Sequence, residues 1–291
     1  STRKESSAAS DVYKRQEVGT FTTDNKDGEF TFINVADSQA KTYEEAVLSA
    51  ETFRKATETV EGEEFIILNG DVVDTGSKEE QWGWMLDEAK DVLYKTPFLA
   101  VAGNHEDDDN SFYEHFNVMP AEGSDTKSGV YYSYDYENTH FIMLNSNEDS
   151  EEYRNFTPAQ IDWMKKDAAA AKERGVDWII ATLHKGPYTT SNHATDDDIM
   201  DANGVRNKVA PLLAEVGVDL VLQGHDHIYA LSKPINKDLK AQEPVIEAMD
   251  YKGNKVDYII NPDGSVYMIP NTAGPKAVSY THLTLPTTPY V

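Results

Sequence analysis

The sequence has no cysteine, few basic residues for its size and no long apolar run. Without cysteine there are no disulfides, thiolate metal sites or cysteine nucleophiles, so any metal must be held by Asp, Glu, Asn or His. The 26 Lys and Arg against 51 Asp and Glu give a net charge of -25. This balance argues against nucleic acid or an anionic membrane surface as a partner, since both need basic patches. No membrane-spanning segment is predicted.

The composition is nevertheless that of a folded protein. Hydrophobic residues make up 39% and aromatic residues 10% of the 291 residues, too many for a disordered acidic chain. The length suffices for one large domain or two modest ones with a sizeable core. The acidity indicates solubility or cation binding, and the lack of cysteine leaves the compartment open.

Both ends of the chain resemble translated sequencing-adapter DNA. SSAASDVYKRQ (6–16) matches the translation of a transposon-end adapter, and VSYTHLTLPTT (278–288) matches that of its reverse complement. Ordinary Ser-rich and Thr/Pro-rich tails are the alternative, and for either end alone that alternative stays open. The two ends match the two strands of one oligonucleotide, which favours an adapter origin over two unrelated native tails. We therefore expect residues 1–16 and 278–291 to be non-native, and 17–277 to be a fragment of a longer protein.

Between these ends, β-rich runs alternate with helical patterns, which predicts an α/β fold with a parallel-rich sheet. Thr157, Pro158 and Gln160 form a helix start, with Thr as N-cap. Residues 131–146 predict two antiparallel strands, so a purely doubly wound sheet is not expected, and residues 233–264 predict a loop or short hairpin. The other expected strands cover residues 29–37, 64–71, 96–104, 177–184, 219–225 and 264–271, and the expected helices cover residues 43–60, 78–93, 111–119, 157–175 and 203–216.

Metal-competent side chains follow the carboxyl ends of these strands, where open α/β sheets bind ligands. Any one of them has a plain structural alternative, such as a turn in which Gly takes a left-handed conformation and His lies at a polar rim. Five groups in the same topological position predict a single site. The residues are Asp37, Asp71, Asn104, His105, His184, His225 and His227.

These residues stand in ordered blocks that resemble the calcineurin-like metallophosphoesterases, and among them the purple acid phosphatase-like branch. The blocks are DSQ (37–39), GDVVD (70–74), GNHE (103–106), His184 and GHDH (224–227), and the resemblance covers about residues 29–274. It implies a catalytic domain over 29–277, built as a four-layer α-β-β-α sandwich of two mixed sheets. It also implies a bacterial protein of the D-x-Q and G-D-x-x-D variant.

The resemblance further implies two metal ions. Asp71 would bridge them, Asp37 and His227 would bind one, and Asn104, His184 and His225 would bind the other. Oxygen and imidazole ligands suit Fe, Mn or Zn. Two such ions about 3.5 to 4 Å apart can neutralise a phosphate ester and activate water. His105 would protonate the leaving group as general acid, and His193 would contact substrate phosphate, although an exposed loop histidine is an alternative of nearly equal weight.

Two positions depart from the family pattern. Asp74 stands where purple acid phosphatases have the tyrosine whose bond to Fe(III) gives their colour, so we predict a colourless protein. Gln39 stands where the wider superfamily has a metal-binding histidine, and it would bind through its carbonyl oxygen or only hold a metal-bound water. The metal at that site is left open. Acidic runs at 106–109, 147–152 and 196–198 are interpreted as solvated loops.

The predicted function is hydrolysis of phosphate monoesters of a small molecule by a metal-activated water. The alternatives are a phosphodiesterase or nucleotide hydrolase using the same centre, and a noncatalytic surface-binding module retaining the fold. EVGTFTT (17–23) alternates apolar and polar residues, which predicts the last strand of a truncated domain, with a linker to residue 28. The family resemblance implies that this domain is immunoglobulin-like or fibronectin-like. The full protein would then carry that domain and be extracellular or surface-attached.

Overall fold

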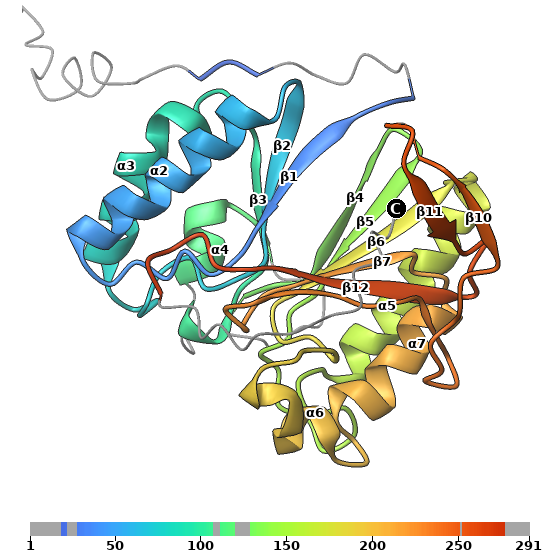
Figure 1. Ribbon diagram of the computed structural model, residues 1–291. Coiled ribbons are helices and arrows are strands. Elements are labelled where there is room, and N and C mark those ends of the chain that lie inside the picture. Colours follow the sequence, from blue (N-terminus) through green and yellow to red (C-terminus); the bar gives the residue numbers. More distant parts are fainter. Residues whose placement is uncertain (1–18, 22–27, 107–110, 120–128, 251, 277–291) are drawn as a thin grey trace, which may run out of the picture.

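The computed structural model describes residues 19–21, 28–106, 111–119, 129–250 and 252–276. These residues form the expected sequence of layers, helix, sheet, sheet and helix (Figure 1). Helices α2 (Tyr43–Thr59) and α3 (Glu79–Leu93) cover the smaller sheet. Helices α5 (Pro158–Arg174) and α7 (Ala210–Glu215) cover the larger one.

The smaller sheet consists of β1 (Thr31–Val35), β2 (Glu63–Leu68) and β3 (Phe98–Ala100), in that order. Every pairing described in it is parallel, so the mixed character expected of both sheets belongs to the larger sheet alone. Val35 pairs with Leu68, which in turn pairs with Ala100. The three strands therefore end level, and the loops that follow them begin side by side.

The larger sheet has the order β4-β5-β6-β7-β12-β8, and β9 (Ile235–Asn236) pairs beside β8 along β12. Its central strands are parallel, while β4, β8 and β9 run antiparallel to their neighbours. β5 and β4 form the predicted hairpin. The bounds are β4 (Tyr132–Tyr136), β5 (Thr139–Met143), β6 (Trp178–Leu183), β7 (Leu220–Gln223), β8 (Tyr229–Leu231) and β12 (Gly264–Pro270).

One predicted helix differs in form. Residues 203–216 were expected to be a single α-helix, but a π-helix, η3 (Val205–Val209), precedes α7. Pro211 has no N–H to donate to the preceding turn, which favours a wider turn at this point. The Ala210 N–H accordingly bonds to the Val205 carbonyl, five residues back.

Short elements complete the described chain. The predicted hairpin within 233–264 is confirmed as β10 (Ile246–Met249) and β11 (Lys255–Tyr258), which pair antiparallel. The other elements are the 3₁₀ helices η1 (Asn104–Glu106) and η2 (Asn192–Thr195) and the helices α4 (Ser111–Phe116) and α6 (Asp197–Met200).

The core has three apolar clusters, one for each contact between layers. The cluster between the two sheets is rich in aromatic rings. The Phe32 and Phe65 rings stack with their centroids 5.4 Å apart, and the Phe141 ring meets Phe65 edge-on at 5.5 Å. Such pairs add roughly 0.5–1.5 kcal/mol each to the stabilisation from buried area. They hold the two sheets, and hence their loops, in a fixed relation.

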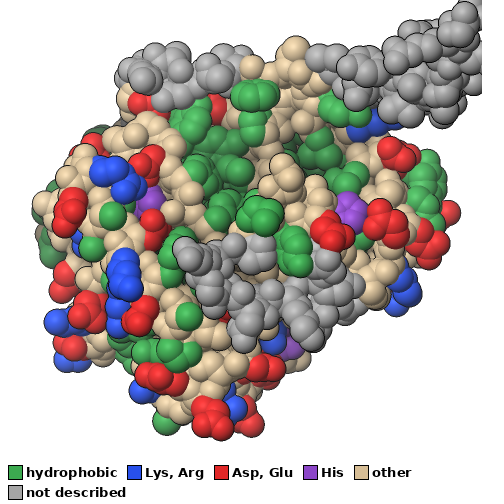
Figure 2. Space-filling model, turned by 180° about the vertical axis from the view of Figure 1, so that it is seen from behind, with side chains coloured by type: hydrophobic (Ala, Val, Ile, Leu, Met, Phe, Trp, Pro, Cys, Tyr) green, Lys and Arg blue, Asp and Glu red, His purple; other side chains and the backbone are tan. Residues whose placement is uncertain are grey.

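The chain termini lie largely outside the described residues. Both adapter-like segments and most of the strand predicted at 17–23 fall there; residues 19–21 are described and are not in a strand. The Thr20 N–H donates to the Tyr94 carbonyl at 2.7 Å. Within the described ranges, no helix is both long and apolar enough to span a bilayer. Figure 2 shows hydrophobic side chains gathered near the top of one face, with acidic side chains on both sides.

Candidate metal centre

The segments that follow β1, β2, β3, β6 and β7 carry the predicted site residues to one edge of the two sheets. Asp37 and Asp71 follow β1 and β2, and Asn104 and His105 lie in η1 after β3. His184 immediately follows β6, and His225 and His227 lie between β7 and β8. Each of these residues contacts at least one other, so the structure brings the whole predicted set together.

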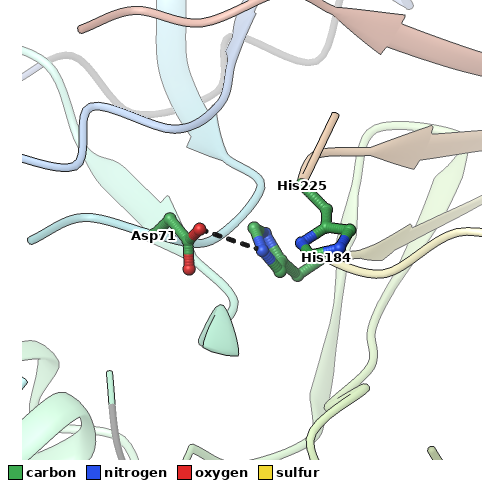
Figure 3. A group of neighbouring side chains, drawn as sticks. All are labelled: Asp71, His184 and His225. Atoms are coloured by element: carbon green, nitrogen blue, oxygen red, sulfur yellow. Dashed lines mark ion pairs between the residues drawn. The ribbon is translucent and has the colours of Figure 1, made fainter. Parts of the chain in front are cut away.

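Asp71, His184 and His225 form the centre of this set (Figure 3). One ligand atom from each lies within 4.8 Å of the other two. The His184 Nε2 atom is 3.2 Å from Asp71 Oδ2, and both side chains are buried. The three groups come from three different strand ends and point toward one another, an arrangement suited to a single cation.

The charges of this group are strongly coupled. Burial alone would raise the pKa of Asp71, but His184 outweighs it and lowers that pKa to about 2. Burial would lower the pKa of His184, yet the Asp71 carboxylate raises it to about 9. Burial, together with His184, lowers the pKa of His225 to about 2. At neutral pH, Asp71 and His184 are therefore an ion pair, and His225 is a neutral imidazole able to donate a lone pair.

A backbone carbonyl fixes the orientation of the His184 ring. His184 Nδ1 donates to the Asn69 carbonyl at 2.7 Å, and Nε2 lies 3.1 Å from Asn104 Oδ1. A hydrogen bond of this kind at one ring nitrogen commonly orients the other toward a metal. The carbonyl thus directs His184 Nε2 at the Asp71 and Asn104 oxygens.

Asp37 and Gln39 lie in the segment that follows β1. Asp37 Oδ1 accepts the His225 N–H at 3.1 Å and lies 3.7 Å from His227 Nε2. Asp37 Oδ2 and Gln39 Oε1 are buried and have no hydrogen-bond partner among the described residues. Burial raises the pKa of Asp37, because its charged form is poorly solvated. Unpartnered buried acceptors are costly, and a cation bound beside Asp37 would satisfy its Oδ2.

The backbone at these strand ends is unusual. Asp37, Gln39, Asp71 and His225 have φ between 44° and 69°, in the left-handed region that non-glycine residues seldom adopt. The loops also lie very close together: a Cβ at Gly103 would be 2.0 Å from Asp71 Oδ1. Strained residues of this kind cluster at functional sites and need support from their surroundings.

His105 lies beside Asp71 with its ring fixed by a neighbouring loop. Its N–H donates to Asp71 Oδ1 at 3.0 Å, and its Nδ1 donates to the Asp74 carbonyl at 2.7 Å. A carbonyl can only accept, so Nδ1 carries the hydrogen, and Nε2 is the nitrogen that can exchange a proton. The Asp74 carboxylate itself lies 3.5 Å from the Lys41 ammonium and 3.7 Å from that of Lys276.

His193 lies next to the centre. Its ring centroid is 4.5 Å from that of His225, and its Nδ1 lies 2.7 Å from Asp196 Oδ2. The Ser191 hydroxyl caps η2, accepting the His193 N–H at 3.2 Å, and donates to the Asp226 carboxylate. The loop carrying His193 is therefore tied to the loop carrying His225 and His227.

Glu106 closes the GNHE block, but the sequence analysis gave it no role in the site. It was assigned to a solvated acidic loop at 106–109, but its side chain is fully buried. Its carboxylate accepts the N–H groups of Asp71, Val72, Val73 and Gly103. Glu148, in the second acidic run, is also buried and accepts the Thr157 N–H. Its place as the last residue of the GNHE block was the signal for Glu106.

The fold and this cluster together define an α/β sandwich with a metal-competent site at its strand ends. Residues 30–229 match the calcineurin-like phosphoesterase family, and the chain belongs to that family. It is 30% identical over 178 residues to purple acid phosphatase 18 of Arabidopsis thaliana, covering 58% of this chain and 39% of the relative. It is 31% identical over 189 residues to purple acid phosphatase 23 of the same plant, covering 61% of this chain and 38% of that relative.

A solved structure supports the fold. Purple acid phosphatase PPD1 from yellow lupin (Lupinus luteus) seeds has a TM-score of 0.61 with this chain at 17% identity, covering 87% of this chain and 47% of the lupin protein. Similarity at that identity concerns the fold alone. The chain spans about two fifths of the length of the curated relatives named above.

Proposed function

We propose that this chain is a metal-dependent phosphatase that hydrolyses phosphate monoesters of small molecules. The observation that carries the proposal is the convergence of Asp71, His184 and His225 within 4.8 Å, with the Asp37 carboxylate, whose Oδ2 has no partner, bonded to the His225 N–H. Membership of the phosphoesterase family and similarity to purple acid phosphatases support the same chemistry.

Two metal ions are assigned to this cluster. Asn104, His184 and His225 would hold one, while Asp37, His227 and the Gln39 carbonyl oxygen would hold the other, with Asp71 between them. The mixture of carboxylate, amide and imidazole donors fits Fe, Mn or Zn. When bound, such ions supply charge neutralisation of the phosphate ester and activation of water. The -25 net charge of the chain is then no obstacle to an anionic substrate.

His105 is assigned the role of general acid. Its Nδ1 is engaged by the Asp74 carbonyl, so Nε2 holds and transfers the proton that the leaving alkoxide requires. His193 is assigned to the substrate phosphate. The bond from its Nδ1 to Asp196 leaves Nε2 as the nitrogen that would face a phosphate oxygen, to which the imidazolium form would donate, and the ring lies against His225.

The test is a paired measurement on the purified chain. Bound metals are quantified by mass spectrometry, and hydrolysis of a chromogenic phosphomonoester and a chromogenic phosphodiester is assayed on the same sample. We expect metal to be bound and the monoester to be hydrolysed faster. A faster diester reaction would contradict monoester specificity. Metal binding without hydrolysis of either compound would reject the enzymatic function and favour a noncatalytic module.

A further inference from the structure

The Glu106 carboxylate joins two of the loops that build the metal centre. Its Oε1 accepts the N–H groups of Val72 at 2.8 Å and Val73 at 3.3 Å. Its Oε2 accepts that of Asp71 at 3.0 Å and that of Gly103. Three of the donors follow β2 and one follows β3, so a single side chain binds both strand ends.

The backbone leaves these N–H groups dependent on Glu106. Asp71 has φ of 52°, and a left-handed residue interrupts the regular pairing that would otherwise satisfy its neighbours. Burial, together with the Asp71 charge, raises the pKa of Glu106 to about 8. In either protonation state its two oxygens offer enough lone pairs to accept all four N–H groups, which would otherwise be buried without a partner.

The same bonds determine where two assigned metal ligands lie. Glu106 is in η1 with Asn104 and His105, and the His105 N–H donates to Asp71 Oδ1 at 3.0 Å. A second contact closes the arrangement, because the Gly76 N–H donates to the His105 carbonyl at 2.8 Å. Any displacement of η1 relative to the turn after β2 would therefore move Asn104 and Asp71 apart.

We propose that Glu106 is a positioning residue for the metal centre, which sets the relative placement of Asp71 and Asn104 through the backbone rather than by touching metal or substrate. This inference rests on the proposed function, since it takes Asp71 and Asn104 to be ligands. A carboxylate that served only stability would weaken the fold on replacement and leave the metal affinity of the folded protein unchanged.

Glu106→Gln tests this distinction. Glutamine has the same shape but replaces one acceptor oxygen by an NH₂ group, which cannot receive the N–H groups it would face. Glu106→Asp is the second variant. It keeps the carboxyl group with both acceptor oxygens, but its side chain is one methylene too short to reach both loops. Asp219→Asn is the matched control. Asp219 also accepts a backbone N–H, that of Ile179 at 2.8 Å. This contact lies where β6 and β7 begin, at the far end of these strands from the metal centre.

The measurements are Mn²⁺ affinity by calorimetry and thermal unfolding of the metal-free proteins. Outer partners of metal ligands contribute about 10- to 100-fold to metal affinity, so we expect a loss of about that size in both Glu106 variants. The Asp219 variant should bind Mn²⁺ as the unmodified chain does. Unchanged Mn²⁺ affinity in a folded Glu106 variant would overturn the positioning role of Glu106 and leave the proposed function standing. If the unmodified chain bound neither Mn²⁺ nor Zn²⁺, both the proposed function and the positioning role of Glu106 would be rejected.

Discussion

His184 Nε2 lies 3.2 Å from Asp71 Oδ2, and both side chains are buried where the two sheets meet. The pair joins the end of β6 in the larger sheet to the end of β2 in the smaller one. Neither sheet alone could form it. Each partner favours the charged form of the other in the metal-free protein, so a bound cation would take the place of the His184 proton beside the Asp71 carboxylate.

Asp71→Asn should abolish most metal binding. The substitution keeps the shape but removes the charge that pairs with His184 and, in the proposed centre, lies between two cations. We expect metal affinity and hydrolysis to fall by more than about 100-fold, because even outer partners of metal ligands contribute 10- to 100-fold. Metal content after dialysis reports the change. Asp91→Asn, at a surface carboxylate paired with Arg54, is the control and should retain full metal content.

His105→Ala should slow turnover and leave the metal in place. General acids contribute about 10²- to 10⁴-fold, and we expect kcat to fall within that range. The measurement is kcat alongside metal stoichiometry. His115→Ala controls for the loss of a histidine elsewhere, since His115 stacks on Trp82 outside the site and its variant should turn over substrate normally. Loss of metal from the His105 variant would show that its assigned role is wrong.

Gln39→Ala distinguishes the two roles considered for Gln39. If the buried Oε1 is a ligand, the variant should bind one metal ion about tenfold or more weakly, and Gln39→His, which offers a better ligand, should bind it more tightly. Calorimetric titration with Zn²⁺ resolves the two sites. Equal affinity in the alanine variant would leave Gln39 only the role of holding a water.

The iron-loaded protein should be colourless in the region where purple acid phosphatases absorb. Asp74 supplies no phenolate, and its carboxylate faces the ammonium groups of Lys41 and Lys276 at 3.5 and 3.7 Å. The visible spectrum of the protein after loading with Fe(III) tests this expectation. A strong charge-transfer band would mean that some tyrosine reaches the metal and that the ligand assignment is incomplete.

Stability should decline with rising pH because of His140. This side chain is buried between Asp135 and Asp167, at 2.6 and 2.8 Å. Burial would lower its pKa, but the two carboxylates raise it above 6.5. A raised folded-state pKa stabilises the protein fully below 6.5 and loses that contribution as pH rises through the folded value. Urea unfolding between pH 6 and 9 should show this slope, and His140→Gln should reduce it, leaving the part that comes from the raised pKa of His184.

Local patterns in the sequence determined much of the framework. Thr157, Pro158 and Gln160 predicted the start of α5, and the Thr157 hydroxyl does accept the Gln160 N–H at 3.2 Å. Gly175 ends that helix in the left-handed conformation, with φ of 86°. These features depend on residues a few positions apart, so they can be read without knowing the fold. The ordered strand-end blocks likewise indicated the site residues, because level parallel strands bring their ends together.

The tertiary structure alone decided how those residues are held. Glu106 looked like the first residue of an acidic loop, and only the approach of β2 to β3 gives its carboxylate four N–H groups to accept. His193 was expected either to contact phosphate or to be an exposed loop histidine; its side chain is exposed, and η2 brings its ring to 4.5 Å from that of His225. Such contacts join segments far apart in the chain, and they form only when the packing of the fold buries those segments side by side. The sequence determined which chemical groups are present; packing of the two sheets decided which of them meet.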